Sequence, residues 1–193
     1  NPKLKTLQRI ILRRLLGRLK CHAAVTGFER RHSIVTNAIC HTGKAVVVRM
    51  DLEDFFPNTK AERVAEYFKK IGWNKAAHEA LLRLCAYKGG LPQGAPTSPR
   101  LSNLVNHRMD ARLHALAAKH NAVYTRYADD LTFSFAQDNP AAVRNLIAST
   151  GNIAVDVGYA IHKGKKLHIR RQHDRQLVTG LVVNKKINLP RPT

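Results

Sequence analysis

Residues 122–135 read AVYTRYADDLTFSF, in which two runs rich in β-branched and aromatic residues flank Ala128, Asp129 and Asp130. Such runs around an Asp-rich turn are typical of a β-hairpin. Residues 45–50, AVVVRM, form another short β-branched run, which predicts a buried strand with Asp51 at its C-terminal end. If the strand and the hairpin share one sheet, Asp51 and the Asp129–Asp130 pair could meet at the same sheet edge.

Apolar residues recur at helical spacing on both sides of these strands. The pattern predicts helices after Asn1-Pro2, at residues 60–70 and 75–87, from Pro99 to about residue 119 with Ser98 as N-cap, and from Pro140 to about residue 149. The apolar stripe of the first helix consists of Leu4, Leu7, Ile11 and Leu15. Residues 176–183 and 186–189 predict a final hairpin through Asn184. This mixture of hairpins and helices predicts an α+β fold with helices packed on one face of the sheet.

The chain is strongly basic. Its 193 residues include 33 Lys and Arg against 13 Asp and Glu, a formal net charge of +20, while 44% hydrophobic residues are enough to form a core. Such charge favours a nucleic-acid partner, although a solvated basic surface or a binder without chemistry would look the same. No apolar run could span a membrane, and Cys21, Cys40 and Cys85 have neither zinc-ligand nor disulfide spacing. These features indicate a reduced, cytosolic protein that faces nucleic acid.

The few acidic residues are grouped. Five of the thirteen fall in two short stretches, one with Asp51, Glu53 and Asp54 and the other with Asp129 and Asp130. Grouped carboxylates in a cationic protein repel a polyanion unless a divalent metal lies between them. The pattern therefore favours metal-assisted phosphoryl chemistry on a nucleic acid. The alternative is that Asp129 and Asp130 only form a turn and that Asp51 only caps a helix.

Three motifs resemble those of reverse transcriptases, in the order of that family. They are RMDLEDFFP at residues 49–57, LPQG followed by SP within residues 91–99, and YADD at residues 127–130. Within the family, NAICH at residues 37–41 and VTG at residues 178–180 resemble signatures of the retron type. The resemblance implies a right-hand polymerase palm, an antiparallel sheet with helices on one face, plus partial fingers. It places the fingers at residues 1–44 and the palm at 45–193, with connecting helices at about 59–88.

The resemblance also implies an RNA-directed DNA polymerase that uses two Mg²⁺ ions, with Mn²⁺ as a possible substitute. Asp51 and Asp129 would be metal ligands. Asp130 would be a third catalytic carboxylate beside them and would also count among the metal residues, and the backbone carbonyl of Leu52 would be a further ligand. The two ions would activate the 3′-hydroxyl and stabilise the leaving pyrophosphate.

Several residues would bind the incoming nucleotide by the same resemblance. Phe56 would act as a steric gate that selects deoxynucleotides, or else be an ordinary core aromatic. Gln93 and Gly94 would lie beneath the nucleotide and the template base, or else form only a tight turn. Lys165 would contact the triphosphate, with Lys166 as the alternative, and Arg31 would do so from the fingers, with Arg30 and His32 as alternatives.

Asn37 and His41 lie one helical turn apart, so they would either contact RNA or form a hydrogen-bonded structural pair.

The retron resemblance implies partners as well. These are an RNA template, a primer–template duplex, deoxynucleoside triphosphates, a structured noncoding RNA and an effector protein, in the bacterial cytoplasm and in phage defence, without a membrane. Family members continue into a helical thumb, so a chain that ends at Thr193 is expected to be a fragment. The alternatives are an RNA-binding palm module that does not polymerise, and a reverse transcriptase of the group II intron or abortive-infection type. The matches at residues 37–41 and 178–180 weigh against the latter.

Overall fold

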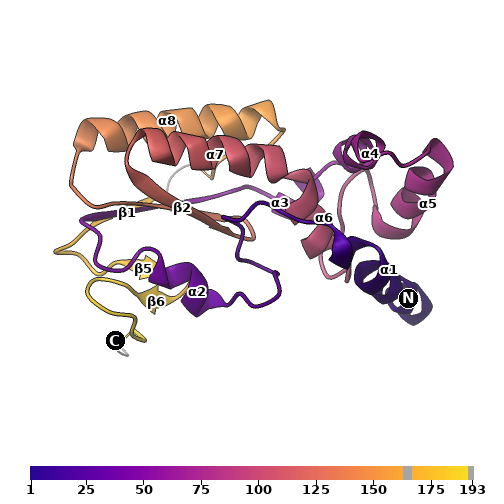
Figure 1. The fold of residues 1–193 in the computed structure, drawn as a ribbon, viewed down its shortest axis with the longest axis horizontal. Coiled ribbons are helices and arrows are strands. Elements are labelled where there is room, and N and C mark those ends of the chain that lie inside the picture. Colours follow the sequence, from indigo (N-terminus) through magenta and orange to yellow (C-terminus); the bar gives the residue numbers. More distant parts are fainter. Residues whose placement is uncertain (163–166, 191–193) are drawn as a thin grey trace. The chain divides into compact units, whose positions relative to one another are not determined.

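The computed structural model describes residues 1–162 and 167–190 (Figure 1). The chain divides into two compact units. The first, called the helical unit, comprises Asn1–His22 and Asp54–Arg108. The second, called the sheet unit, comprises Ala23–Glu53 and the chain from Met109 onward.

The sheet unit is built on a four-stranded antiparallel sheet in the order β2-β3-β1-β4. Its strands are β1 (Val46–Asp51), β2 (Ala122–Tyr127), β3 (Asp130–Phe135) and β4 (His168–Arg171). The predicted hairpin and the predicted strand before Asp51 are therefore confirmed. The sequence pattern missed β4, because a short, basic strand at a sheet edge lacks the apolar alternation that marks a strand.

Helices α7 (His107–Lys119) and α8 (Pro140–Asp156) lie side by side over one face of this sheet (Figure 1). That face carries Val48, Phe133 and Tyr124, which are paired across the strands, and the rings of Phe133 and Tyr124 stack with centroids 4.8 Å apart. The predicted α+β fold with helices on one face of an antiparallel sheet is confirmed.

The opposite face is covered at one end by smaller elements (Figure 1). Helix α2 (Ile34–Ile39) and the hairpin of β5 (Leu177–Val178) and β6 (Leu181–Val182) lie there. Val47 of β1 packs with Ala38 of α2 and with Val178, Leu181 and Val183 in a small buried cluster. Because side chains alternate along a strand, Arg49 and Asp51 stand on the same face as Val47.

The helical unit surrounds its own apolar core. Its elements are α1 (Pro2–Arg14), the 3-10 helix η1 (Leu16–Arg18), α3 (Phe55–Asn58), α4 (Ala61–Lys70), α5 (Lys75–Cys85) and α6 (Ser98–Val105). The core includes Leu16, Phe68 and Leu104. Of the stripe predicted for the first helix, Ile11 is buried in this core, whereas Leu4, Leu7 and Leu15 are 37%, 40% and 45% exposed. None of the described helices is long and apolar enough to cross a membrane.

Several predicted helix bounds differ from those in the structure. The helix predicted from Pro99 to residue 119 is divided at Asn106 into α6 and α7, where the buried Asn106 side chain accepts a hydrogen bond of 2.7 Å from Arg63. Its N-cap is Thr97 and not Ser98. Helix α8 continues to Asp156, seven residues beyond the predicted end, because Ile153 and Ala154 extend its buried stripe.

The predicted turn of the final hairpin was also wrong. The chain reverses between β5 and β6 at Thr179 and Gly180, whose φ angles are +47° and +83°. Positive φ at both central residues is the mark of the two-residue turn that suits the twist of a hairpin. Asn184 instead anchors a neighbouring loop, since its amide donates to the carbonyls of Gln172 and Asp174 at 3.0 and 2.7 Å.

Candidate active site

Asp51 and Asp130 lie opposite each other at one end of the sheet. The antiparallel register of β1 and β3 pairs them directly, with Asp51 as the last residue of β1 and Asp130 as the first of β3. Directly opposed residues in an antiparallel pair point to the same face, with Cα atoms about 4.5–5.5 Å apart. The structure therefore brings together two of the three predicted carboxylates, 79 positions apart in the chain, on the face that α7 and α8 leave uncovered.

Asp129 belongs to the turn that joins β2 to β3. Its backbone carbonyl accepts a hydrogen bond of 3.1 Å from the N–H of Leu52, the residue after Asp51. Ala128, beside it, has a φ angle of +57°, which is uncommon for a residue with a side chain. The turn is thus held against the end of β1 in a conformation that the surrounding structure must impose.

A buried ion pair supports this turn from the helix side of the sheet. The guanidinium of Arg126 in β2 donates two hydrogen bonds of 2.8 Å to the carboxylate of Asp110 in α7, and neither side chain is exposed. The same guanidinium donates to the carbonyl of Ala128 at 2.9 Å. Tyr124 also donates to Asp110, at 2.9 Å, and burial together with the Asp110 charge raises the pKa of this tyrosine well above its usual value. Helix α7 is thereby tied to the strand that carries the turn.

The segment before α2 holds the turn from another side. The backbone N–H groups of Thr26 and Gly27 donate to the carbonyl of Arg126 at 2.9 and 3.4 Å. A Cβ atom on Gly27 would lie 2.5 Å from the backbone nitrogen of Ala128, so only glycine permits this close approach. The ring of Phe28 follows, with its centroid 6.3 Å from that of Tyr127.

Asp130 forms an ion pair with Arg49, two residues before Asp51 in β1. The guanidinium donates to one carboxylate oxygen through Nη2 at 2.6 Å and through Nε at 3.2 Å. Burial raises the pKa of Asp130, the Arg49 charge opposes this shift, and the nearby Asp51 carboxylate adds to it. The Arg49 effect is larger than that of Asp51, so burial is the main reason that the pKa of Asp130 stays above its usual value.

The carboxylate oxygens at this end of the sheet, where Asp51 and Asp130 lie, suit a divalent cation. Carboxylate oxygens are hard ligands, and Mg²⁺ is commonly held by one or two carboxylates together with water and substrate phosphates. Within residues 1–162 and 167–190, no three His, Cys, Asp or Glu side chains are grouped so that they could hold a metal ion. A cation here would therefore take part of its coordination from backbone carbonyls, water or a phosphate-bearing substrate.

Three predicted nucleotide-binding residues belong to the helical unit. Phe56 is half-buried in α3, where it packs against the core of that unit, and its ring centroid is 5.3 Å from that of the buried Phe55. Gln93 and Gly94 are exposed in the loop before α6, and Gly94 has a φ angle of +81° that favours glycine.

The residues predicted to contact the triphosphate fall into two groups, an exposed group in the loop before α2 and a pair of lysines outside the described residues. Arg31 is exposed in the loop before α2 and has a φ angle of +65°, and its neighbours Arg30 and His32 are exposed too. Lys165 and Lys166 lie outside the described residues.

Asn37 and His41 are both fully buried in the sheet unit. His41 forms hydrogen bonds with Ser134 at 2.7 Å and Thr125 at 2.8 Å, on two neighbouring strands, and Asn37 accepts one of 2.7 Å from Thr26. Burial, with a smaller effect of Lys44, lowers the pKa of His41 to about 3, so its ring is neutral at neutral pH. This geometry favours the structural alternative over direct contact with RNA.

Sequence reasoning missed Arg49, Arg126 and Asp110. Asp110 falls among Met109, Leu113 and Ala117 on the buried side of α7. Arg126 comes two residues after Tyr124 in β2, so both stand on the side of the strand that faces the helices. Opposite charges at interior positions of two successive elements were the available signal for a buried pair. No comparable signal marks Arg49, because only the register of β1 against β3 brings it to Asp130.

Comparison with known proteins agrees with the motifs at this site. Residues 1–179 match the family described as reverse transcriptase (RNA-dependent DNA polymerase). The chain is 39% identical to the retron Ec86 reverse transcriptase of Escherichia coli, with 96% of the chain and 57% of that protein aligned. It is also 39% identical to the retron Mx162 reverse transcriptase of Myxococcus xanthus, over 95% of the chain and 43% of that protein. The chain thus spans about half the length of the curated relatives it matches.

A solved structure supports the same fold. Apo telomerase from Candida tropicalis, truncated from its C-terminal domain, matches with a TM-score of 0.61 over 98% of this chain and 44% of that one, at 12% sequence identity. That identity is too low to indicate more than a shared fold. The family match and the retron relatives lead to one assignment: the chain belongs to the reverse transcriptase (RNA-dependent DNA polymerase) family and, within it, to the retron type.

Proposed function

We propose that the protein is a retron-type RNA-directed DNA polymerase that copies a structured noncoding RNA into DNA. The observation that carries this proposal is the pairing of Asp51 with Asp130 at the sheet edge, next to the Asp129 turn, in a chain of this family. Grouped carboxylates in a protein with a net charge of +20 have a clear use when a cation mediates their approach to a nucleic acid.

Reverse transcriptases as a family use divalent metal ions, and we infer that two Mg²⁺ ions serve here, with Mn²⁺ as a possible substitute. Asp51 and Asp129 would hold them, together with the Leu52 carbonyl, and the ions would supply the charge that activates a 3′-hydroxyl and stabilises the leaving pyrophosphate. Asp130 would act beside them as a carboxylate whose position Arg49 fixes. Arg126 would keep the Asp129 turn in place through its hydrogen bond to Ala128.

The nucleotide contacts form part of the same proposal. Phe56 would exclude a ribose 2′-hydroxyl, and its place in the short helix after the Asp51 strand is compatible with that role. Gln93 and Gly94 would lie beneath the nucleotide and template base, since an exposed loop with a glycine at positive φ allows the backbone to approach a ligand closely. Arg31 and Lys165 would bind the triphosphate, with Arg30, His32 and Lys166 as the alternatives.

The names of the relatives support the proposed biology. We infer that the partners are an RNA template, a primer–template duplex and deoxynucleoside triphosphates, with a retron noncoding RNA as template and primer scaffold. An effector protein, a role in phage defence and a location in the bacterial cytoplasm extend the proposal. The division into fingers at 1–44 and palm at 45–193 also stays part of it.

Primer extension by the complete protein tests this function. RNA template, annealed primer, Mg²⁺ and deoxynucleoside triphosphates should give DNA, and Asp51→Asn or Asp129→Ala should lower extension at least a hundredfold, since each would remove a metal ligand. Asp156→Asn is the matched control, because Asp156 is a surface carboxylate in an ion pair with Arg112. Normal extension by Asp129→Ala would refute the site.

A second candidate function is RNA binding without polymerase activity. The ion pair between Arg49 and Asp130 favours it, because a carboxylate held by a guanidinium no longer needs a cation to offset its charge. Tight RNA binding by the complete protein, without metal-dependent incorporation of nucleotides, would support this alternative.

A further inference from the structure

A buried hydrogen-bond network joins the segment that bears Asn37 to strand β2. The hydroxyl of Thr26 donates to the side-chain oxygen of Asn37 at 2.7 Å and lies 3.2 Å from the carbonyl oxygen of Arg126. Asn37 and Arg126 are fully buried, and Thr26 is only 5% exposed. Hydrogen bonds in such an interior are stronger than in water, and an unpaired polar group there is costly. The network therefore holds its members at fixed positions.

The network reaches the Asp129 turn through backbone contacts. The backbone N–H of Thr26 donates to the carbonyl of Arg126 at 2.9 Å. The next residue, Gly27, passes so close to Ala128 that a Cβ atom on it would lie 2.5 Å from the nitrogen of Ala128. Because backbone packed this tightly has no free space to yield, a shift of this segment would move Ala128 and, with it, Asp129.

His41 holds the two strands that lead into and out of the turn. Its ring forms hydrogen bonds with the hydroxyl of Thr125 in β2 at 2.8 Å and with that of Ser134 in β3 at 2.7 Å. Burial lowers the pKa of His41 to about 3, so the ring stays neutral and has one donor and one acceptor nitrogen for the two hydroxyls. Because Thr125 directly precedes Arg126, His41 and Asn37 are linked to adjacent residues of β2.

The side chains of Asn37 and His41 are inaccessible to a nucleic acid. Asn37 lies in α2, His41 follows two residues after the end of that helix, and both are 0% exposed. Direct contact with RNA would require the core beneath α2 to open. Their hydrogen bonds lead instead to the hairpin that carries Asp129.

We propose that Asn37 and His41 are positioning residues for catalysis, which act through the hydroxyls they bind to hold the Asp129 turn against the end of β1. The proposal rests on the proposed polymerase function and gives the signature at residues 37–41 a task in it. Transfer of a nucleotide requires the reacting atoms within narrow limits, and a misplacement of about 1 Å can cost about a hundredfold in rate. Loss of the network should therefore lower the rate of nucleotide incorporation and leave substrate binding unchanged.

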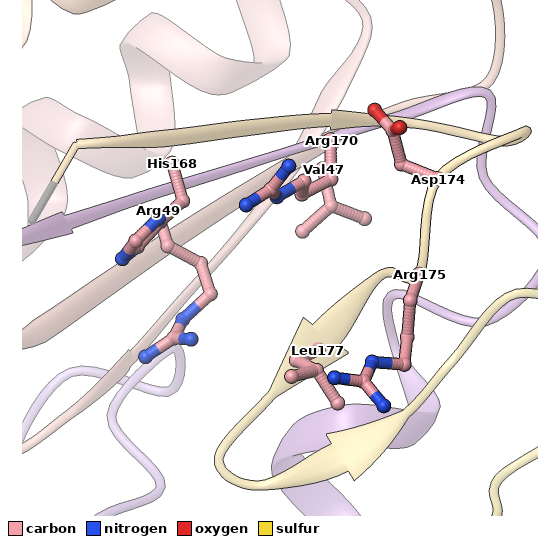
Figure 2. A pocket seen from close by; sticks show the side chains of 7 residues that line it. All are labelled: Val47, Arg49, His168, Arg170, Asp174, Arg175 and Leu177. Atoms are coloured by element: carbon pink, nitrogen blue, oxygen red, sulfur yellow. The ribbon is translucent and has the colours of Figure 1, made fainter. Parts of the chain in front are cut away.

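The network is separate from the cationic surface of the sheet unit. Figure 2 shows a basic cavity of about 330 Å³ whose wall includes Arg49 of β1 and His168 and Arg170 of β4. The described residues that line this cavity come from β1, β4, β5 and the segment between β4 and β5, and none of them belongs to the network. Removing a hydroxyl from the network leaves these cations in place, so the affinity for a nucleic-acid duplex is an independent readout.

The test removes single hydroxyls from the network in the complete protein. Thr26→Val keeps the shape of the side chain but loses its hydrogen bonds, whereas Thr26→Ser keeps the hydroxyl. Ser134→Ala is a second, independent variant, which removes one hydrogen bond of His41. Thr150→Val is the matched control, because Thr150 is fully buried in α8 and its hydroxyl has no hydrogen-bond partner among the described residues.

Three measurements separate positioning from binding and from stability. Single-turnover incorporation of one nucleotide gives the maximal rate and the nucleotide affinity, and anisotropy with a labelled primer–template duplex gives the duplex affinity. Hydrogen exchange of the peptide at residues 124–133, followed by mass spectrometry, reports on the turn without any substrate.

Thr26→Val should lower the maximal rate roughly tenfold or more, while both affinities stay within about twofold of those of the unaltered protein. Exchange at residues 124–133 should become faster in the same variant. Ser134→Ala should lower the rate roughly threefold, since it removes one hydrogen bond. Thr26→Ser and Thr150→Val should stay within about twofold of the unaltered protein in rate and exchange.

Unchanged incorporation rates in Thr26→Val and Ser134→Ala would overturn the proposal, and if Thr26→Val does not fold, Ser134→Ala decides alone. Weaker duplex binding at an unchanged rate would also overturn it and would assign the segment to nucleic-acid binding. An equal loss of rate in Thr150→Val would overturn it as well, because the cause would then be general destabilisation. If the unaltered protein extends no primer, the polymerase function is refuted and positioning for catalysis falls with it, whereas hydrogen exchange still shows whether the network holds the turn.

Discussion

Asp110 and Arg126 carry opposite charges in a place that water does not reach, with both side chains 0% exposed. Replacing Asp110 by Asn would leave Arg126 as a buried cation with a weakened partner. We expect Asp110→Asn to lower the free energy of unfolding by about 3–5 kcal/mol. Chemical denaturation measures this, and Arg112→Gln, which breaks an ion pair with side chains 40% and 56% exposed, should cost less than about 1 kcal/mol. Equal effects of the two variants would contradict the structural role of the buried pair.

His41 should make stability depend on pH. Its folded-state pKa is lowered from 6.5 to about 3, mainly by burial. Between these values the unfolded chain binds a proton that the folded chain does not, so stability is lost as the pH falls below 6.5. His41 alone should account for a loss of about 2 kcal/mol between pH 7 and pH 5.

Urea denaturation at the two pH values checks this expectation. His41→Gln should reduce the stability loss between pH 7 and pH 5 by that amount, whatever its effect at pH 7. His173→Gln is the control, because the His173 side chain is 77% exposed. An unchanged pH dependence in His41→Gln would show that His41 is not buried in neutral form.

At the level of single residues, the sequence predicted the acidic pair but not the residues that hold it. Asp51 and Asp130 stand at the ends of β-branched and aromatic runs, so their meeting follows once the two strands pair in register. Arg49 and Arg126 acquire their roles from partners 81 and 16 positions away. Such contacts depend on the packed structure, and one sequence carries only weak signs of them.

At the level of elements, local sequence patterns predicted the helices and strands correctly where one face is apolar. They were misleading where a hydrogen bond of a polar side chain marks the end of an element. The helices α4 and α5 and the β2–β3 hairpin follow their apolar periodicity. The break between α6 and α7 instead depends on a hydrogen bond from Arg63 to Asn106, 43 positions away. The β5–β6 turn at Thr179 and Gly180 lies within the residues 178–180 that were quoted as a family signature, and its positive φ angles could have been suspected from the glycine.

Two glycines in different elements should respond to alanine with opposite signs. Gly180 has a φ angle of +83°, so Gly180→Ala should destabilise the β5–β6 hairpin by about 1–2 kcal/mol. Gly151 lies inside α8 with nothing within 4 Å of an added Cβ, so Gly151→Ala should stabilise the protein by about 0.5–1 kcal/mol. Urea denaturation measures both changes, and a shift of the same sign in both would contradict the described backbone conformations.

At the scale of the whole molecule, the net charge of +20 should govern binding to nucleic acid. Residues 1–31 alone carry nine Lys and Arg against Glu29, and such groups release counterions from a duplex when they contact phosphates. If 6–10 phosphates are contacted, the affinity of the complete protein for a primer–template duplex should fall by about 10³–10⁵-fold between 50 and 200 mM salt. Anisotropy titrations measure the slope, and a peptide nucleic acid of the same sequence, which has no phosphates, should show almost no salt dependence. A slope near zero with the natural duplex would mean that the charge serves another purpose, because no set of phosphate contacts escapes counterion release.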